Sequence, residues 1–108
     1  MANLPITGTP TNVFSPLCGF VEGVSKNRKI AAFYLGRTND LVATSSRHGC
    51  EEIVPMYQTS STRNACMIED VLIKSFYAHR KCVNYATHSG GCTSEDYINF
   101  VYIAVWFK

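Results

Sequence analysis

The stretch Ile-Ala-Ala-Phe-Tyr-Leu-Gly-Arg-Thr-Asn-Asp, residues 30–40, decides the fold. Its first six residues form an apolar run of strand length that stops at Gly36. The last three residues, Thr, Asn and Asp, carry side-chain oxygens that cap the first turn of a helix. A strand that leads directly into a helix is therefore predicted, with the helix running over about 40–49 and stopping at Gly49.

Two further elements are recognisable downstream. From Ala65 to Phe76 an apolar residue recurs every three or four positions, which predicts a helix over about 62–79. Residues 100–107, Phe-Val-Tyr-Ile-Ala-Val-Trp-Phe, are apolar at successive positions, so both sides of this segment avoid water. That pattern is typical of a strand that is buried on both faces.

The rest of the chain has weaker signals. Residues 1–16 are rich in Pro, Thr and Asn and are expected to form an extended arm. A short strand is expected over 17–24, a connection over 50–60, and a brief helix from Ser94. Residues 17–108 are then predicted to be one α+β domain, with a small central antiparallel sheet of three to four strands flanked by helices.

Composition excludes several classes of protein. The net charge of +2 is too small to indicate nucleic-acid binding by itself. No apolar run approaches the ~18 residues of a membrane span, and the first residues lack the pattern of a secretory signal. The odd number of cysteines, five, disfavours a disulfide framework. We therefore expect an intracellular protein with free cysteines and no membrane contact.

Glu69 is the residue that conflicts with its surroundings. On a helix its neighbours three and four positions away are Ala65, Cys66, Leu72 and Ile73, all on its face. A carboxylate buried there without a partner costs several kcal/mol. It could pair with an internal Arg, bind a metal, or titrate as a perturbed acid. The alternative is a rotated helix that leaves Glu69 at the edge of the stripe.

These residues together resemble the GIY-YIG nuclease family. Tyr34-Leu35-Gly36 and the polar residues after it are similar to the second half of the family motif. His48 stands where family members often carry a histidine. Glu69 matches the single essential Glu of the family's metal-binding helix, and Asn84 lies close to its downstream Asn. The resemblance spans about residues 19–91 and implies a GIY-YIG-like fold and hydrolysis of DNA phosphodiester bonds.

The sequence departs from the family pattern at two positions. The best match to the first half-motif, Gly19-Phe20-Val21, ends in Val21 where the family has Tyr. Tyr102 on the terminal strand is another source of a hydroxyl. Thr44 stands where the family usually has its catalytic Arg. Arg47, one helical turn on, and Arg37 are the expected substitutes.

The resemblance assigns a role to each candidate. Glu69 would hold one Mg²⁺ or Mn²⁺ ion, since a hard cation needs few protein ligands and keeps several waters. Tyr34 or His48 would take the proton of the attacking water. Arg47, with Arg37 in reserve, would clamp the phosphate oxygens.

The remaining expectations concern contacts outside the reaction centre. Asn84 would orient Glu69 or the backbone around it. DNA, the expected partner, would be bound by Lys26, Arg28, Lys29, Arg37, Arg47 and Arg63. Because the chain is short, a homodimer or a separate DNA-binding domain is expected to add affinity.

Two alternatives remain open from the sequence. In the first, the same fold has lost its activity through Val21 and Thr44 and only binds DNA or protein. In the second, His79, Cys82, His88 and Cys92 hold a structural zinc ion in a small interaction domain. Their spacing matches no common zinc finger, so zinc is the less favoured metal.

Overall fold

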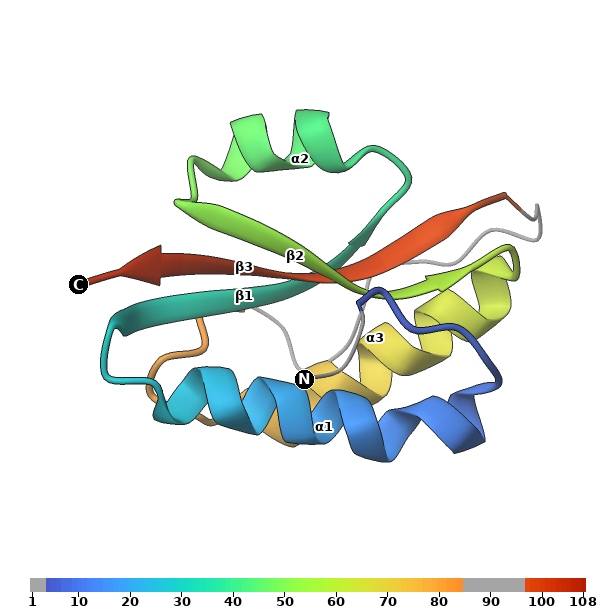
Figure 1. Ribbon diagram of the computed structural model, residues 1–108, viewed down its shortest axis with the longest axis horizontal. Helices are drawn as coiled ribbons and strands as arrows, with labels where there is room; N and C mark the ends of the chain where they lie inside the picture. The colour runs from blue at the N-terminus through green and yellow to red at the C-terminus, as the bar shows by residue number, and fades with distance from the viewer. Residues whose placement is uncertain (1–3, 85–96) are drawn as a thin grey trace.

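A computed structural model describes residues 4–84 and 97–108 and shows an α+β fold. Within these ranges three helices surround a three-stranded antiparallel sheet (Figure 1). The elements are α1 (Pro10–Lys26), β1 (Ile30–Thr38), α2 (Leu41–His48), β2 (Glu52–Thr59), α3 (Thr62–Phe76) and β3 (Asn99–Phe107). The predicted fold class is therefore confirmed.

The last strand, β3, is the centre of the sheet. The strand order is β1-β3-β2, and β3 pairs antiparallel with both neighbours. Helices α1 and α3 cover one face of the sheet and α2 lies on the other (Figure 1). Residues 101–105 are all buried, which explains why this segment is apolar at successive positions and confirms the predicted strand.

The hydrophobic core fills the space between the sheet, α1 and α3. Leu35 of β1, Leu72 of α3 and Leu17 of α1 are each at most 1% exposed within it. α3 begins where predicted, because the Ser61 side chain accepts a hydrogen bond from the amide of Asn64. It ends three residues before the predicted boundary.

The first strand and second helix follow the sequence closely. β1 begins at Ile30 and continues three residues beyond the predicted end. The Asp40 side chain accepts a hydrogen bond from the amide of Ala43 and so caps α2. Gly49 ends α2 in the left-handed region, with φ of 61°, which glycine adopts without steric cost.

The N-terminal prediction is wrong. Residues 10–26 form a helix rather than the end of an extended arm and a strand. Val13, Leu17, Val21 and Ser25 are buried at intervals of four, which is the spacing of a helix face that packs on a core. Prolines inside the segment obscured this pattern, although one of them occupies the first turn, where proline is tolerated.

The connection predicted over 50–60 is also wrong, since it contains β2. Pro55 lies inside this strand and lacks the amide hydrogen that a central strand needs. β2 is an edge strand of the sheet, and its register shifts between Pro55 and Tyr57. The proline is accommodated by these two features, which a single sequence does not reveal.

The described residues test some of the remaining predictions and not others. The predicted helix from Ser94 lies outside them. Cys18, Cys50 and Cys82 are free as expected, but Cys66 is disulfide-bonded, so the expectation of free cysteines throughout is wrong. Its partner lies outside the described residues. Within those residues, no helix is long and apolar enough to span a membrane.

Candidate active site

Strand β1 carries candidate residues on both of its faces. Leu35 points into the core on the α1 and α3 side, and Arg37 points the same way toward α3. Tyr34 and Gly36 point to the other side, toward α2. The site is therefore built around this strand, with contributions from α2, α3 and β3.

On the α2 side, a tyrosine and a histidine from distant segments meet. The Tyr102 hydroxyl of β3 lies 2.8 Å from Nε2 of His48, which is the last residue of α2. The Tyr102 ring lies over Gly36, its partner in the register of β1 and β3. A Cβ atom at position 36 would lie 2.5 Å from the Tyr102 oxygen. Glycine is required there because a side chain would displace the hydroxyl.

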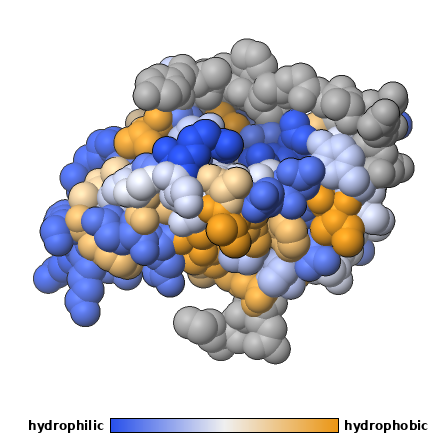
Figure 2. Space-filling view, turned by 90° about the horizontal axis from the view of Figure 1, so that it is seen from above, coloured by the Kyte–Doolittle hydropathy of each residue, from blue (hydrophilic) through white to orange (hydrophobic). Residues whose placement is uncertain are grey.

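The His48 ring is held by aromatic neighbours. Its centroid is 4.7 Å from that of Tyr34 and 6.3 Å from that of Trp106, which meets it edge-on. We call Tyr34, His48 and Tyr102 the tyrosine–histidine cluster. Figure 2 shows the molecule from the α2 side, where hydrophilic and hydrophobic residues are interspersed. The cluster thus occupies the face of the sheet that the two long helices leave free.

Burial sets the protonation of this cluster. Partial burial and the nearby charge of Arg47 lower the pKa of His48. Burial, followed by the influence of Tyr34, raises the pKa of Tyr102 well above its ordinary value, although Arg47 opposes this shift. At neutral pH the imidazole is therefore neutral and the phenol protonated. When the neutral imidazole carries its proton on Nδ1, Tyr102 donates and His48 Nε2 accepts the hydrogen bond between them.

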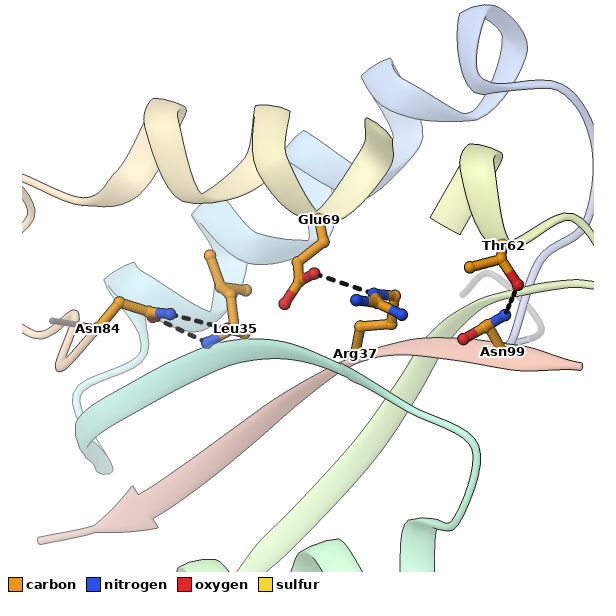
Figure 3. A network of polar contacts seen from close by, with 6 residues as sticks. All are labelled: Leu35, Arg37, Thr62, Glu69, Asn84 and Asn99. Carbon is orange, nitrogen blue, oxygen red and sulfur yellow. Dashed lines mark hydrogen bonds and ion pairs between the residues drawn. The ribbon is translucent and has the colours of Figure 1, made fainter. Parts of the chain in front are cut away.

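On the α3 side, Glu69 is buried and paired. It is 8% exposed, and its Oε1 accepts from Nε of Arg37 at 3.2 Å (Figure 3). Burial raises the pKa of Glu69, and the positive charge of Arg37 opposes the rise. Of the arrangements that the sequence left open, the structure shows the ion pair. The alternative with Glu69 at the edge of the apolar stripe is wrong.

The position of Glu69 depends on how α3 is anchored. Thr62 at the start of the helix is fully buried, and its Oγ1 accepts from the side-chain amide of Asn99 on β3 (Figure 3). Two turns later the helix presents Glu69 to β1. The charge of Glu69 also contributes to the raised pKa of Tyr102, so the two sides of the site interact electrostatically across β1.

Arg47 and Thr44 lie on different sides of α2, one exposed and the other buried. Arg47 is exposed on α2, and its charge acts on both His48 and Tyr102. Thr44 is 1% exposed, and its hydroxyl donates to Oγ1 of Thr38 at 2.7 Å. Because Thr44 is buried and its hydrogen bond joins α2 to the end of β1, this position has no space for an arginine. Arg47, in contrast, lies beside the tyrosine–histidine cluster.

Asn84 acts on β1 and not on Glu69. Its side chain accepts from the amide of Leu35 at 3.0 Å and donates to the carbonyl of Leu35 at 2.8 Å (Figure 3). It therefore imitates a neighbouring strand at the outer edge of β1. The prediction that Asn84 orients Glu69 or the backbone around Glu69 stays a prediction, since these two bonds are made to Leu35 of β1.

The metal prediction rests on Glu69 alone. No cluster of three or more His, Cys, Asp or Glu side chains exists among residues 4–84 and 97–108. One oxygen of Glu69 is engaged by Arg37. The residues fit a hard cation that takes one carboxylate oxygen and keeps its waters, and they do not form a cage of protein ligands.

The predicted DNA-binding cations fall into three groups. Lys26, Arg28 and Lys29 are exposed in and after the last turn of α1, while Arg37 and Arg47 flank the site. Arg63 is exposed at the start of α3. For the zinc alternative, His79 accepts from the amide of Lys81 and Cys82 donates to Asn84. The other two proposed zinc ligands, His88 and Cys92, lie outside the described residues.

Tyr102, the other source of a hydroxyl that the sequence offers, lies on β3. Gly19-Phe20-Val21, the best match to the first half-motif, lies within α1, and Val21 is fully buried in the core. Tyr102 was identifiable from the sequence only as another hydroxyl, and Trp106 gave no functional signal within its apolar run. Comparison of the chain with protein-family models, curated proteins and solved structures gives no match.

Proposed function

We propose that this protein is a metal-dependent DNA endonuclease with a GIY-YIG-like site. The observation that carries the proposal is the Tyr102 hydroxyl, 2.8 Å from His48 and over Gly36, with a buried carboxylate on the other side of the same strand. In this proposal Tyr102 would serve as the tyrosine that the GIY-YIG pattern requires and that the N-terminal half-motif lacks.

The tyrosine–histidine cluster is suited to proton transfer. The attacking water would donate a proton toward the Tyr102 oxygen while Tyr102 passes its own proton to neutral Nε2 of His48. The water oxygen forms a bond to phosphorus, and the bond from phosphorus to the leaving oxygen breaks. Because the pKa of His48 is lowered, the imidazole is free to accept a proton at neutral pH.

The charged residues would stabilise the pentavalent phosphate. Arg47, exposed beside the cluster, would contact the non-bridging oxygens. Glu69 would hold one Mg²⁺ or Mn²⁺ ion, which supplies charge neutralisation at the leaving oxygen when bound. Arg37 positions the Glu69 carboxylate and prevents it from lying in the apolar interior without a counter-charge.

A plasmid nicking assay with Mg²⁺ and with Mn²⁺ tests the proposal. Cleavage is expected in the wild type and is expected to fall at least about 100-fold in Tyr102→Phe and His48→Gln, the usual range for a lost acid–base group. Tyr97→Phe is a matched control, since Tyr97 is exposed outside the cluster. Metal-dependent cleavage that survives in Glu69→Gln would contradict the assignment of the metal ligand.

A second candidate function is favoured by the Arg37–Glu69 ion pair. Because this pair occupies an oxygen of the expected metal ligand, the same fold could serve only to bind DNA. That function predicts salt-dependent DNA binding without nicking in either metal. The nicking assay therefore separates the two candidates, provided that DNA binding is measured on the same preparations.

A further inference from the structure

Cations from three separate segments converge at one end of the molecule. Lys108 donates its backbone amide to the carbonyl of Lys29 at 2.9 Å. Lys81 donates its ammonium to the carbonyl of Asn27 at 3.0 Å. The end of α1, the start of β1, the segment after α3 and the end of β3 lie together on the left of Figure 1. We call Lys26, Arg28, Lys29, Arg80, Lys81 and Lys108 the basic end.

Lys81 shows how concentrated the positive charge is. This residue is 6% exposed, and the structure describes no carboxylate partner for its ammonium group. Burial and the charges of Lys108 and Arg80 lower its pKa. Its bond to the carbonyl after α1 satisfies the negative end of that helix. The other five cations are exposed and exceed what one helix end requires.

Few acidic groups border the basic end in the described residues. Glu51 accepts a hydrogen bond from the amide of Phe107. Glu22 lies one turn before Lys26 on α1. Glu52 lies with Asn27, Ile30 and Phe107 around one pocket at this end. Six cations against these three carboxylates leave a net positive surface, although the whole chain carries only +2. A surface of this kind attracts the phosphates of a nucleic acid.

The basic end is connected to the candidate site along the outer edge of β1. The carbonyl of Lys81 accepts from the amide of Phe33, and the amide of Val83 donates to the carbonyl of Phe33. Asn84 then binds Leu35, two residues before Arg37. Residues 81–84 thus follow β1 from the basic end toward the Arg37–Glu69 pair.

We infer that the basic end binds the phosphate backbone of duplex DNA on one side of the bond that is cleaved. This inference rests on the proposed function and adds the path of the substrate to it. From Ile30 to Gly36 β1 spans about 20 Å at the usual rise of a strand. Duplex DNA rises 3.4 Å per base pair, so the contacted phosphates lie about 6 base pairs from the cleaved bond.

Charge reversal tests this path. Lys29→Glu, Arg80→Glu and the double variant are compared with Lys74→Glu, an exposed position on α3 that pairs with Asp70. Binding of a 20-base-pair duplex is measured in EDTA over a range of salt concentrations. Thermal unfolding of each variant verifies the fold. The double variant is expected to bind about tenfold more weakly, with a salt slope reduced by about 2, whereas Lys74→Glu binds like the wild type.

The same assay distinguishes failure of the path from failure of the function. If the wild type nicks plasmid DNA and the double variant binds duplex as well as Lys74→Glu does, the path is wrong and the nuclease proposal stands. The double variant could instead bind free phosphate and anionic vesicles more weakly than the wild type does, by the same factor, while its binding of duplex DNA is unaffected. In that case the basic end serves another anion, and the inference is also overturned. Absence of duplex binding by the wild type overturns both proposals.

Substrate length gives an independent readout. With a mapped cleavage position, duplexes are shortened from either side. The inference predicts that binding weakens when one side falls below about 6 base pairs, and that the double variant no longer distinguishes the two sides. Equal dependence on both sides in the wild type would contradict a single flanking contact.

Discussion

Polar side chains on the two faces of strand β1 differ in charge and in how they are neutralised. On the α1 and α3 face, Glu69 is 8% exposed, and it is tolerated because Arg37 lies 3.2 Å away. On the α2 face, Tyr102 is 2% exposed and His48 is partly exposed, and both stay neutral while they share a hydrogen bond. One face thus holds a fixed pair of opposite charges, and the other holds uncharged groups that can exchange a proton.

This difference follows from how each face is covered. Two long helices pack on the first face. A charge buried there is destabilised by desolvation unless a counter-charge offsets that cost. The eight-residue α2 covers the second face only in part. A general acid or base and a metal ion that acts at the leaving oxygen both need access to a substrate, and the carboxylate that holds the metal also needs rigid placement. The two faces therefore differ in how their polar groups are neutralised, by a counter-charge on one face and by a hydrogen bond between neutral groups on the other.

The largest effect is expected from removal of the counter-charge on the buried face. Arg37→Ala leaves Glu69 buried without its partner and is expected to lower the free energy of unfolding by about 3 kcal/mol at pH 7. Urea unfolding at pH 7 and pH 4 measures it. The double variant Arg37→Met, Glu69→Leu is expected to recover much of the loss, because no buried charge remains.

The pH dependence has a definite sign. Burial raises the folded-state pKa of Glu69 above its value of 4.5, and Arg37 opposes that rise. Loss of Arg37 raises this pKa further. A raised carboxyl pKa contributes stability below the unfolded-state value that is lost as pH increases through the folded-state value. The deficit of Arg37→Ala is therefore expected to shrink from pH 7 to pH 4, and a deficit that is independent of pH would contradict a charged, buried Glu69.

The next largest effect is expected at Gly36, where the Tyr102 ring packs closely against β1. Gly36→Ala places a Cβ 2.5 Å from the Tyr102 oxygen, so the ring must move. A loss of about 2 kcal/mol is expected, as for other overpacked sites, together with loss of nicking activity. Gly23→Ala is the control, because no atom lies within 4 Å of its Cβ and alanine favours a helix by about 1 kcal/mol. Equal stability of the two variants would show that the Tyr102 ring is not held over Gly36.

A smaller effect is expected at the outer edge of β1. Asn84→Ala removes two hydrogen bonds to the backbone of Leu35 and is expected to cost about 1–2 kcal/mol. Hydrogen exchange of the Leu35 amide should accelerate more than that of Ile68 in the centre of α3. Asn84→Asp retains an acceptor for the amide but offers no donor to the carbonyl, so an intermediate loss is expected. An unchanged Leu35 exchange rate would contradict this pairing.

The elements that depend on local signals could be predicted from the sequence. β1, α2 and α3 have clear apolar periods and capping residues, and their observed bounds differ from the predictions by at most three residues. α1 and β2 contain prolines that locally argue against regular structure. One proline of α1 is tolerated because it lies in the first turn, and the proline of β2 is tolerated because this edge strand has a register shift. These positions are fixed only when the sheet forms.

The site shows the same limit. Glu69 was detectable because a carboxylate in an apolar helical stripe violates a local rule, and its need for a partner could be stated before the partner was known. Tyr102 violates no such rule, since an aromatic residue in a buried strand is ordinary. Its role depends on the register that sets it opposite Gly36, and that register joins segments more than 60 residues apart.

The smallest effect is a shift in the pKa of His48 on the α2 face. Partial burial and Arg47 lower the pKa of His48 below 6.5, so this residue contributes stability above the unfolded-state pKa that is lost as pH falls through the folded-state value. An NMR titration of the imidazole carbon-bound proton measures it. Arg47→Gln removes a neighbouring charge and is expected to raise the pKa toward 6.5, whereas Arg28→Gln, exposed after α1, is expected to leave it unchanged. Tyr102→Phe is expected to raise it as well, because a donor to the neutral ring is lost. A His48 pKa above 6.5 would contradict the lowering by burial and Arg47 on which the proposed proton path depends.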